Sequence, residues 1–156
     1  MKTRIRTVNK KTLFLMTLLL LLLSLPAATL NAQNVDVTIT GVRSEKGQMV
    51  IGVFKDSESY QAEKAFMSKS FKKNINPDGE MRVQFSLEPG VYGLCLLDDE
   101  DSDGIMHYNF LGMPKEGFGF SDYYHTSFTK PRFDLFKFTL SKGQQKSIKL
   151  RVRYIL

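Results

Sequence analysis

The stretch MRVQFSLEPGVYGLCLL, residues 81–97, holds two strand patterns joined by a turn. In its first half every second residue is apolar, as in a strand that buries one face: Met81, Val83, Phe85 and Leu87. The segment EPG that follows is a turn signal. In its second half, residues 91–97 are apolar on both faces, which is typical of a strand covered on each side. The stretch therefore predicts two strands separated by a turn, within a layered β-fold.

Similar patterns recur along the rest of the chain. The additional predicted strands are residues 35–40, 49–54, 133–140 and 147–155. The side chains expected to point inward from the alternating strands among them are Val35, Val37, Ile39, Phe136, Phe138, Leu140, Ile148, Leu150, Val152 and Tyr154. Turn signals separate the runs at residues 44–48, 76–80 and 141–145. Short strands at hairpin spacing predict an all-β fold, an antiparallel β-sandwich of about seven strands.

One interval, residues 56–73, has a helical pattern instead of a strand pattern. It is rich in helix-forming residues, and Asp56 or Ser57 is suited to cap its start. Its apolar residues fall roughly on one face of a helix: Tyr60, Phe66, Met67 and Phe71. We therefore expect one short helix that covers an end or an edge of the sandwich.

Residues 1–32 have the three-part layout of a secretory signal peptide. Basic residues come first, an apolar run over residues 13–25 follows, and small and polar residues end at Ala32. The apolar run is shorter than the roughly 20 residues that a membrane-spanning helix needs, so we expect cleavage near Ala32. The sequence thus predicts a periplasmic or secreted protein without a membrane span, whose residues 33–156 form a single β-sandwich domain.

The apparent basic character of the chain comes from this leader. The full sequence has 22 Lys and Arg against 16 Asp and Glu, but five of the basic residues and none of the acids precede Gln33. The nearly neutral remainder predicts no nucleic-acid partner, because such proteins carry a basic surface. The chain has one cysteine, which excludes an internal disulfide, so the hydrophobic core must stabilise the domain.

Residues 98–130 form a long segment without a clear period. Loops of this length are usually either functional or disordered. Seven aromatic residues give this one too much apolar surface for a disordered linker: Tyr108, Phe110, Phe118, Phe120, Tyr123, Tyr124 and Phe128. We therefore expect a long aromatic loop that folds back onto the sandwich.

The root of this loop, DEDSDG at residues 99–104, suggests a Ca²⁺ site. Asp99, Asp101 and Asp103 stand at alternate positions before a glycine, as in D-x-D-x-D-G calcium loops, where the carbonyl of Ile105 would add a ligand. Asn109 would supply an amide oxygen. The acid expected at position twelve falls on Phe110, so the loop is not an EF-hand. The alternative is a solvated acidic turn that holds no metal.

Three segments together carry a family resemblance. LEPGVYGLCLLDDEDSDG (residues 87–104), NFLGMPKEGFGFS (109–121) and FDLFKFTL (133–140) resemble the bacterial domain-of-unknown-function family 2141, which consists of small exported proteins. The chain matches the family's loop pattern at Asp99, Gly104 and Asn109, has Asp101 and Asp103 where Asn is usual, and departs from it at Asp98 and His107. The resemblance implies export and a sandwich of the prealbumin or carboxypeptidase-regulatory type, and it implies no activity.

Candidate catalytic residues are few. Cys95 lies mid-strand among leucines, which favours a buried, unreactive thiol. No G-x-S-x-G or H-E-x-x-H motif occurs, and GFGFSD at residues 117–122 lacks the context of a dinucleotide site, so its glycines are expected in a tight turn. We predict a module that binds a ligand or a protein partner and has no catalytic residues. The alternative is a small periplasmic hydrolase that uses His107 or His125 with a loop carboxylate.

The leader makes the first prediction. Mass spectrometry of the exported protein should find an N-terminus near Gln33, because the small residues that end at Ala32 suit signal peptidase. A protein that keeps Met1 and stays in the cytoplasm would contradict it.

Overall fold

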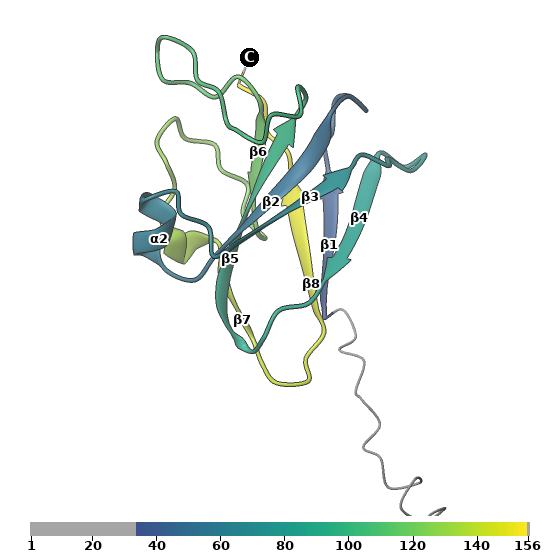
Figure 1. The fold of residues 1–156 in the computed structure, drawn as a ribbon, viewed down its shortest axis with the longest axis vertical. Coiled ribbons are helices and arrows are strands. Elements are labelled where there is room, and N and C mark those ends of the chain that lie inside the picture. The colour runs from purple at the N-terminus through teal and green to yellow at the C-terminus, as the bar shows by residue number, and fades with distance from the viewer. Residues whose placement is uncertain (1–33, 156) are drawn as a thin grey trace, which may run out of the picture. The chain divides into compact units, whose positions relative to one another are not determined.

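The computed structural model describes residues 34–155, so the predicted signal peptide lies outside the described residues. In this part of the chain, eight strands form two sheets (Figure 1). The smaller sheet has the order β4 (Glu80–Phe85), β1 (Val35–Thr40), β8 (Lys146–Arg151). The larger sheet has the order β3 (Met67–Lys72), β2 (Gln48–Phe54), β5 (Gly90–Asp99), β6 (Gly117–Phe120), and β7 (Lys137–Leu140) also pairs with β5.

The two sheets pack face to face around the main hydrophobic core. Most of the side chains that period two placed inward are buried there, among them Val37, Val83 and Leu150. Phe136 instead belongs to a second cluster, and Tyr154 is only partly buried. The central strands β2 and β5 also bury residues on their second face, as their apolar runs predicted. The predicted all-β sandwich with one short helix is confirmed. The likeness to prealbumin stays a prediction.

One strand pair departs from the antiparallel pattern. β1 and β8 run parallel, with Val37 opposite Ile148, whereas the other paired strands are antiparallel. These two strands stand near the beginning and the end of the described residues. Because almost the whole domain connects them, no hairpin turn fixes their relative direction.

The helix is shorter than the sequence predicted. α2 spans Ser57–Gln61, and the Oδ1 atom of Asp56 caps it by accepting a hydrogen bond from Ser59 N at 2.7 Å. The helix ends before Glu63, whose φ is 56°. The prediction was wrong for the C-terminal half of the interval, which forms β3 along the edge of β2. There a strand turns Met67 and Phe71 toward the core and leaves the alternate serines exposed.

A second aromatic cluster lies on the outer face of the larger sheet. The predicted strand at residues 133–140 begins as a 3₁₀-helix, η1 (Phe133–Leu135), before β7 starts. η1 and α2 contact each other beside β5 (Figure 1). The cluster consists of Phe54, Tyr60, Phe120, Phe133 and Phe136.

Among the described residues no helix is long and apolar enough to cross a membrane.

The GFGF segment is a strand, β6, and not the tight turn that the sequence predicted. β6 pairs with β5 and also exchanges backbone hydrogen bonds between Phe118 and Arg153, at 3.0 and 2.8 Å. Both glycines lie against the chain at and beyond β8. A Cβ on Gly117 would lie 2.6 Å from the Val152 side chain, and one on Gly119 would lie 2.9 Å from the Arg151 carbonyl oxygen. The glycines therefore allow the close approach that joins the two sheets.

A substitution at Gly117 tests this packing. Gly117→Ala should lower the free energy of unfolding by about 1–3 kcal/mol, because the added methyl group overpacks the contact with Val152 and Tyr154. Urea denaturation measures the change. The matched control is Ser70→Ala on the exposed face of β3, which should change stability by less than ~0.5 kcal/mol. Equal stability of the two variants would contradict the role given to the glycine.

Candidate functional site

The end of β5 directs two adjacent acids to opposite sides of the larger sheet. Leu94, Leu96 and Asp98 belong to the face that packs on the core, and Asp99 belongs to the outer face. Both aspartates are fully buried. Because successive residues of a strand alternate between faces, one acidic run serves two separate environments.

Asp98 forms a buried ion pair with Lys73, which follows β3. The Lys73 ammonium is the partner of Asp98 Oδ1, and the hydroxyl of Tyr154 donates to Asp98 Oδ2. Lys73 Nζ also donates to the Ser44 carbonyl oxygen at 3.1 Å, and Tyr154 accepts a bond from Arg43 N at 3.0 Å. Burial and the hydrogen bond to Asp98 raise the pKa of Tyr154 above its usual range, so its hydroxyl stays a donor. This network joins four chain segments beneath the loop.

Asp99 organises the turn that begins the loop. Its Oδ1 accepts from Asp103 N at 3.1 Å, and its Oδ2 accepts from Gly104 N at 2.9 Å. The side chain of Gln48 on β2 also donates to Oδ2, at 2.6 Å. The carboxylate thus binds the turn to the neighbouring strand. This is the role expected of an acidic turn residue, and it leaves one lone-pair site, on Oδ1, for a further ligand.

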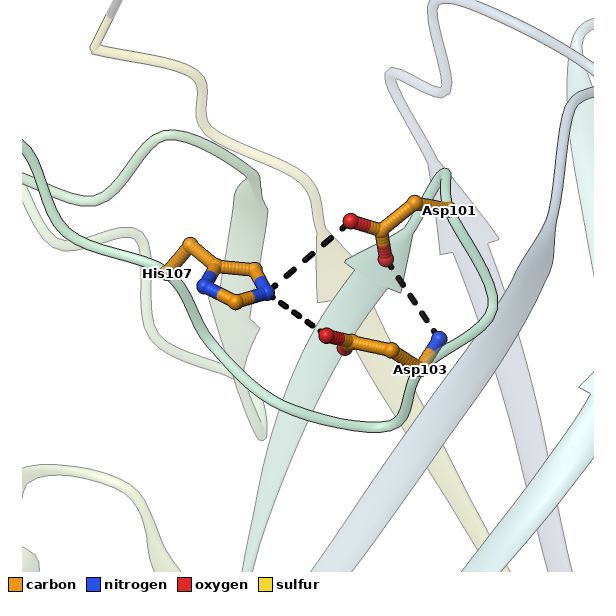
Figure 2. Close-up of side chains that lie close together, drawn as sticks. All are labelled: Asp101, Asp103 and His107. Carbon is orange, nitrogen blue, oxygen red and sulfur yellow. Dashed lines mark hydrogen bonds and ion pairs between the residues drawn. The ribbon is translucent and has the colours of Figure 1, made fainter.

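Asp101, Asp103 and His107 form an exposed group at the surface of the loop (Figure 2). His107 Nε2 lies 2.6 Å from Asp103 Oδ2 and 3.9 Å from Asp101 Oδ2. The hydrogen bond to Asp103 raises the pKa of His107, and the same bond lowers the pKa of Asp103. Asp103 Oδ1 accepts from Ile105 N at 2.8 Å. The protonated form of His107 is therefore stabilised next to the acidic run.

Glu116 joins the acidic run from the far side of the loop. It is 8% exposed, and its Oε2 accepts a bond from His107 N at 3.4 Å. Oxygen atoms of Asp99, Asp101 and Glu116 lie within 4.8 Å of one another. Burial raises the pKa of Glu116, and the charges of Asp101 and Asp99 raise it further. In calcium loops of this type an acid stands at position twelve, where this chain has Phe110. Glu116 supplies an acid from a different place in the loop.

Sequence reasoning did not select Glu116 as a ligand. It stands well beyond the D-x-D-x-D-G spacing, and only the return of the loop to β6 brings it back to Asp99. The available signal was the PKEG segment of the family resemblance, which placed this acid directly before β6.

The outer part of the loop contains the last two residues of the predicted metal site. Ile105 donates its backbone N–H to Asp103 and exposes its side chain. Asn109 Oδ1 accepts from Leu111 N and Met113 N, each at 2.9 Å, and so organises the loop tip. Phe110, at this tip, is 94% exposed. The structure therefore groups Asp101 with Asp99 and Glu116 on one side and with Asp103 and His107 on the other, and it engages the Asn109 amide oxygen in its own turn.

The other candidate catalytic groups lie apart from the acidic turn. His125 is buried; its Nε2 contacts the Thr129 carbonyl oxygen, and its Nδ1 lies 3.5 Å from the Tyr123 hydroxyl. Burial raises the pKa of the Cys95 thiol far above its usual range, which makes a nucleophilic thiolate unfavourable. Within residues 34–155 neither histidine ring hydrogen-bonds to a serine or threonine hydroxyl or to the cysteine.

A cavity of about 650 Å³ lies over the outer face of the larger sheet. Residues of β2, β5 and β6 line it, among them Gly52, Cys95 and Phe118. Its other walls are the loop that follows the acidic turn and the loop at residues 125–131. In Figure 1 both loops project from the side of this sheet that faces away from β1, β4 and β8. The predicted fold-back of the aromatic loop is thus observed in part: Phe118, Phe120 and Tyr123 pack on the sheet, whereas the other four aromatic side chains of the segment are exposed.

Comparison with known proteins identifies a family without a described activity. The model of a family described as "Uncharacterized protein conserved in bacteria (DUF2141)" matches residues 37–149. No curated protein and no solved structure gives a significant match.

The buried ion pair beneath the loop makes a stability prediction. Lys73→Met should lower the free energy of unfolding by about 3–5 kcal/mol, because it leaves the carboxylate of Asp98 buried without its cation. Chemical denaturation measures the loss. The matched control is Arg82→Met, which removes an exposed partner of Glu80 and should cost less than about 1 kcal/mol.

A double variant separates charge from packing. Lys73→Met combined with Asp98→Leu should recover part of the lost stability, because no buried charge then stays unpaired. If the loss of stability in the double variant equalled the sum of the losses in the two single variants, the Lys73–Asp98 ion pair would not be the cause.

Proposed function

The chain belongs to the DUF2141 family of uncharacterized bacterial proteins, and we propose that it is an exported binding module whose aromatic loop is held in place by Ca²⁺. The signal-peptide pattern of residues 1–32 supports export. The acidic turn, together with Glu116 from the far side of the loop, supports a bound cation. The cavity that the loop helps to enclose supports binding as the role of the domain.

The arrangement of Asp99, Asp101 and Glu116 carries the Ca²⁺ proposal. Neighbouring cations already compensate the other acids of the run: Lys73 pairs with Asp98, Arg43 with Glu100, and His107 with Asp103. Asp99 and Glu116 are buried beside Asp101, and because carboxylate oxygens of the three acids lie within 4.8 Å of one another, their negative charges repel. A divalent cation would remove this repulsion, and Ca²⁺ prefers carboxylate oxygens.

Further ligands are close along the chain. Asp103 and the carbonyl oxygen of Ile105 complete the loop ligands that the D-x-D-x-D-G spacing suggests, and water would fill the remaining positions. The cationic form of His107 next to Asp103 opposes a second positive charge. We therefore expect a weak site of the extracellular kind, with a dissociation constant on the order of 10⁻⁴–10⁻³ M.

Hydrolysis is the second candidate function, and one contact favours it. His107 and Asp103 form a hydrogen-bonded pair at 2.6 Å, which is the base and orienting acid of many hydrolases. Unchanged ligand binding by a His107→Ala variant, together with the absence of turnover in the wild type, would leave the binding module as the function.

Thermal unfolding of the exported domain tests the Ca²⁺ proposal. Millimolar Ca²⁺ should raise the melting temperature relative to chelator, and at a hundredfold excess over the dissociation constant the gain is about 2.7 kcal/mol. An Asp101→Asn, Glu116→Gln double variant should lose this response. The control Asp78→Asn, in a separate exposed turn, should keep it. If Ca²⁺ leaves the wild type unchanged, or stabilises the double variant equally, the run is an acidic turn without a metal.

A further inference from the structure

The cavity over the outer face of the larger sheet has the size and composition of a small-molecule site. Its volume of about 650 Å³ falls within the roughly 300–1,000 Å³ of such pockets. Small side chains form its base, including Gly52, Ser68 and Cys95, while Phe118 and Phe120 supply aromatic surface. Residues from two loops complete it, so the sheet alone does not form the site.

One polar group in the cavity wall lacks a partner. Tyr60, which is buried and lines the cavity, has a hydroxyl with no hydrogen-bond partner among residues 34–155. Burial, with smaller effects from Cys95, Glu63 and Tyr108, holds the pKa of Tyr60 far above its usual range, and these three groups line the same cavity. The hydroxyl is therefore a neutral donor that lowers stability as long as it stays unpaired.

The charged groups of the cavity compensate one another. Lys130 Nζ lies 3.0 Å from Glu63 Oε1 and donates to the Tyr60 carbonyl oxygen at 3.1 Å. The ammonium also lies 4.6 Å from the centre of the Tyr60 ring. The buried His125 engages both ring nitrogens, as described above. With its cation already paired, the cavity offers no charge to attract an ionic ligand.

We propose that this cavity binds an uncharged, largely apolar molecule of one or two rings that carries a single hydrogen-bond acceptor for the Tyr60 hydroxyl. The aromatic walls would take the apolar body. The Tyr60 hydroxyl oxygen has almost no accessible surface in this structure, so it would have to become accessible from the cavity to pair with the acceptor. The proposal deepens the binding role proposed above. The ligand would not contact the three acids of the candidate metal site, because none of them lines the cavity, although the loop that Ca²⁺ would hold forms one of its walls.

A fluorescent probe pair tests the ligand class. The first probe is 6-propionyl-2-(dimethylamino)naphthalene, which is neutral and carries one ketone acceptor, and the second is 2-(dimethylamino)naphthalene, which lacks the ketone. Saturable one-to-one binding of the ketone probe to the wild-type protein, with a blue-shifted emission, is the expected result. An anionic naphthalene sulfonate should bind more weakly than the ketone probe.

Tyr60→Phe gives a readout that a purely structural role would not move in the same way. Loss of the hydroxyl should weaken binding of the ketone probe about fivefold, the equivalent of one hydrogen bond, and leave binding of the second probe unchanged. The same variant should melt at a higher temperature than the wild type without ligand, because the unpaired hydroxyl is gone.

Two further variants locate the probe. Cys95→Phe places a ring at the base of the cavity and should abolish binding of both neutral probes, while circular dichroism verifies that the variant is folded. The control Phe110→Ser removes the most exposed aromatic side chain of the loop and should leave binding unchanged. Loss of binding in Phe110→Ser but not in Cys95→Phe would show adsorption to the loop surface and overturn the proposal.

The outcomes are separable from those of the Ca²⁺ experiment. Absence of saturable binding by the ketone probe, or equal binding by wild type and Tyr60→Phe, would overturn the ligand class. Either result leaves a Ca²⁺-dependent melting temperature intact, and a protein that does not respond to Ca²⁺ can still bind the probe.

Discussion

The buried ion pair between Lys73 and Asp98 is the constraint on which the loop end of the domain depends. A carboxylate in this position would be costly without a cation, so the end of β3 must meet the end of β5. The Tyr154 hydroxyl adds the segment after β8, and the Ser44 carbonyl adds the turn before β2. Edges of both sheets are thereby fixed at one point. The glycines of β6 let the larger sheet pack closely against the chain at and beyond β8, in the smaller sheet.

The acidic turn and the cavity lie next to this ion pair because successive side chains of β5 point to opposite faces of the sheet. Asp98 completes the buried network on one face, and Asp99 begins the acidic turn on the other. From Asp99 the loop runs outward and returns at Glu116 to form β6, so its two ends meet across the acidic group. Between the loop and the sheet lies the cavity, whose unpaired Tyr60 hydroxyl is a cost to stability that a ligand would remove. A rigid sheet thus supports a site made of less regular chain.

The sequence by itself determined six of the eight described strands and which of their faces are buried. Alternation is a local property, because side chains on a strand repeat every two residues whatever its neighbours are. The inward placement of Val37, Val83 and Leu150 was therefore predictable. The return of the aromatic loop was predicted only in part, because most of its aromatic side chains are exposed. The D-x-D-x-D-G spacing likewise selected Asp99 and Asp101 before any contact was known.

Only the tertiary structure decided which distant residues meet. The sequence pattern predicted a helix over residues 67–72, but these residues form a strand along the edge of β2. The edge of β2 supplies more backbone hydrogen bonds than a short helix could. The parallel pairing of β1 with β8, the burial of Lys73 against Asp98 and the approach of Glu116 to Asp99 all join segments far apart in sequence. No local period encodes such contacts. They follow from closing two sheets around one core, where each buried charge must find a partner.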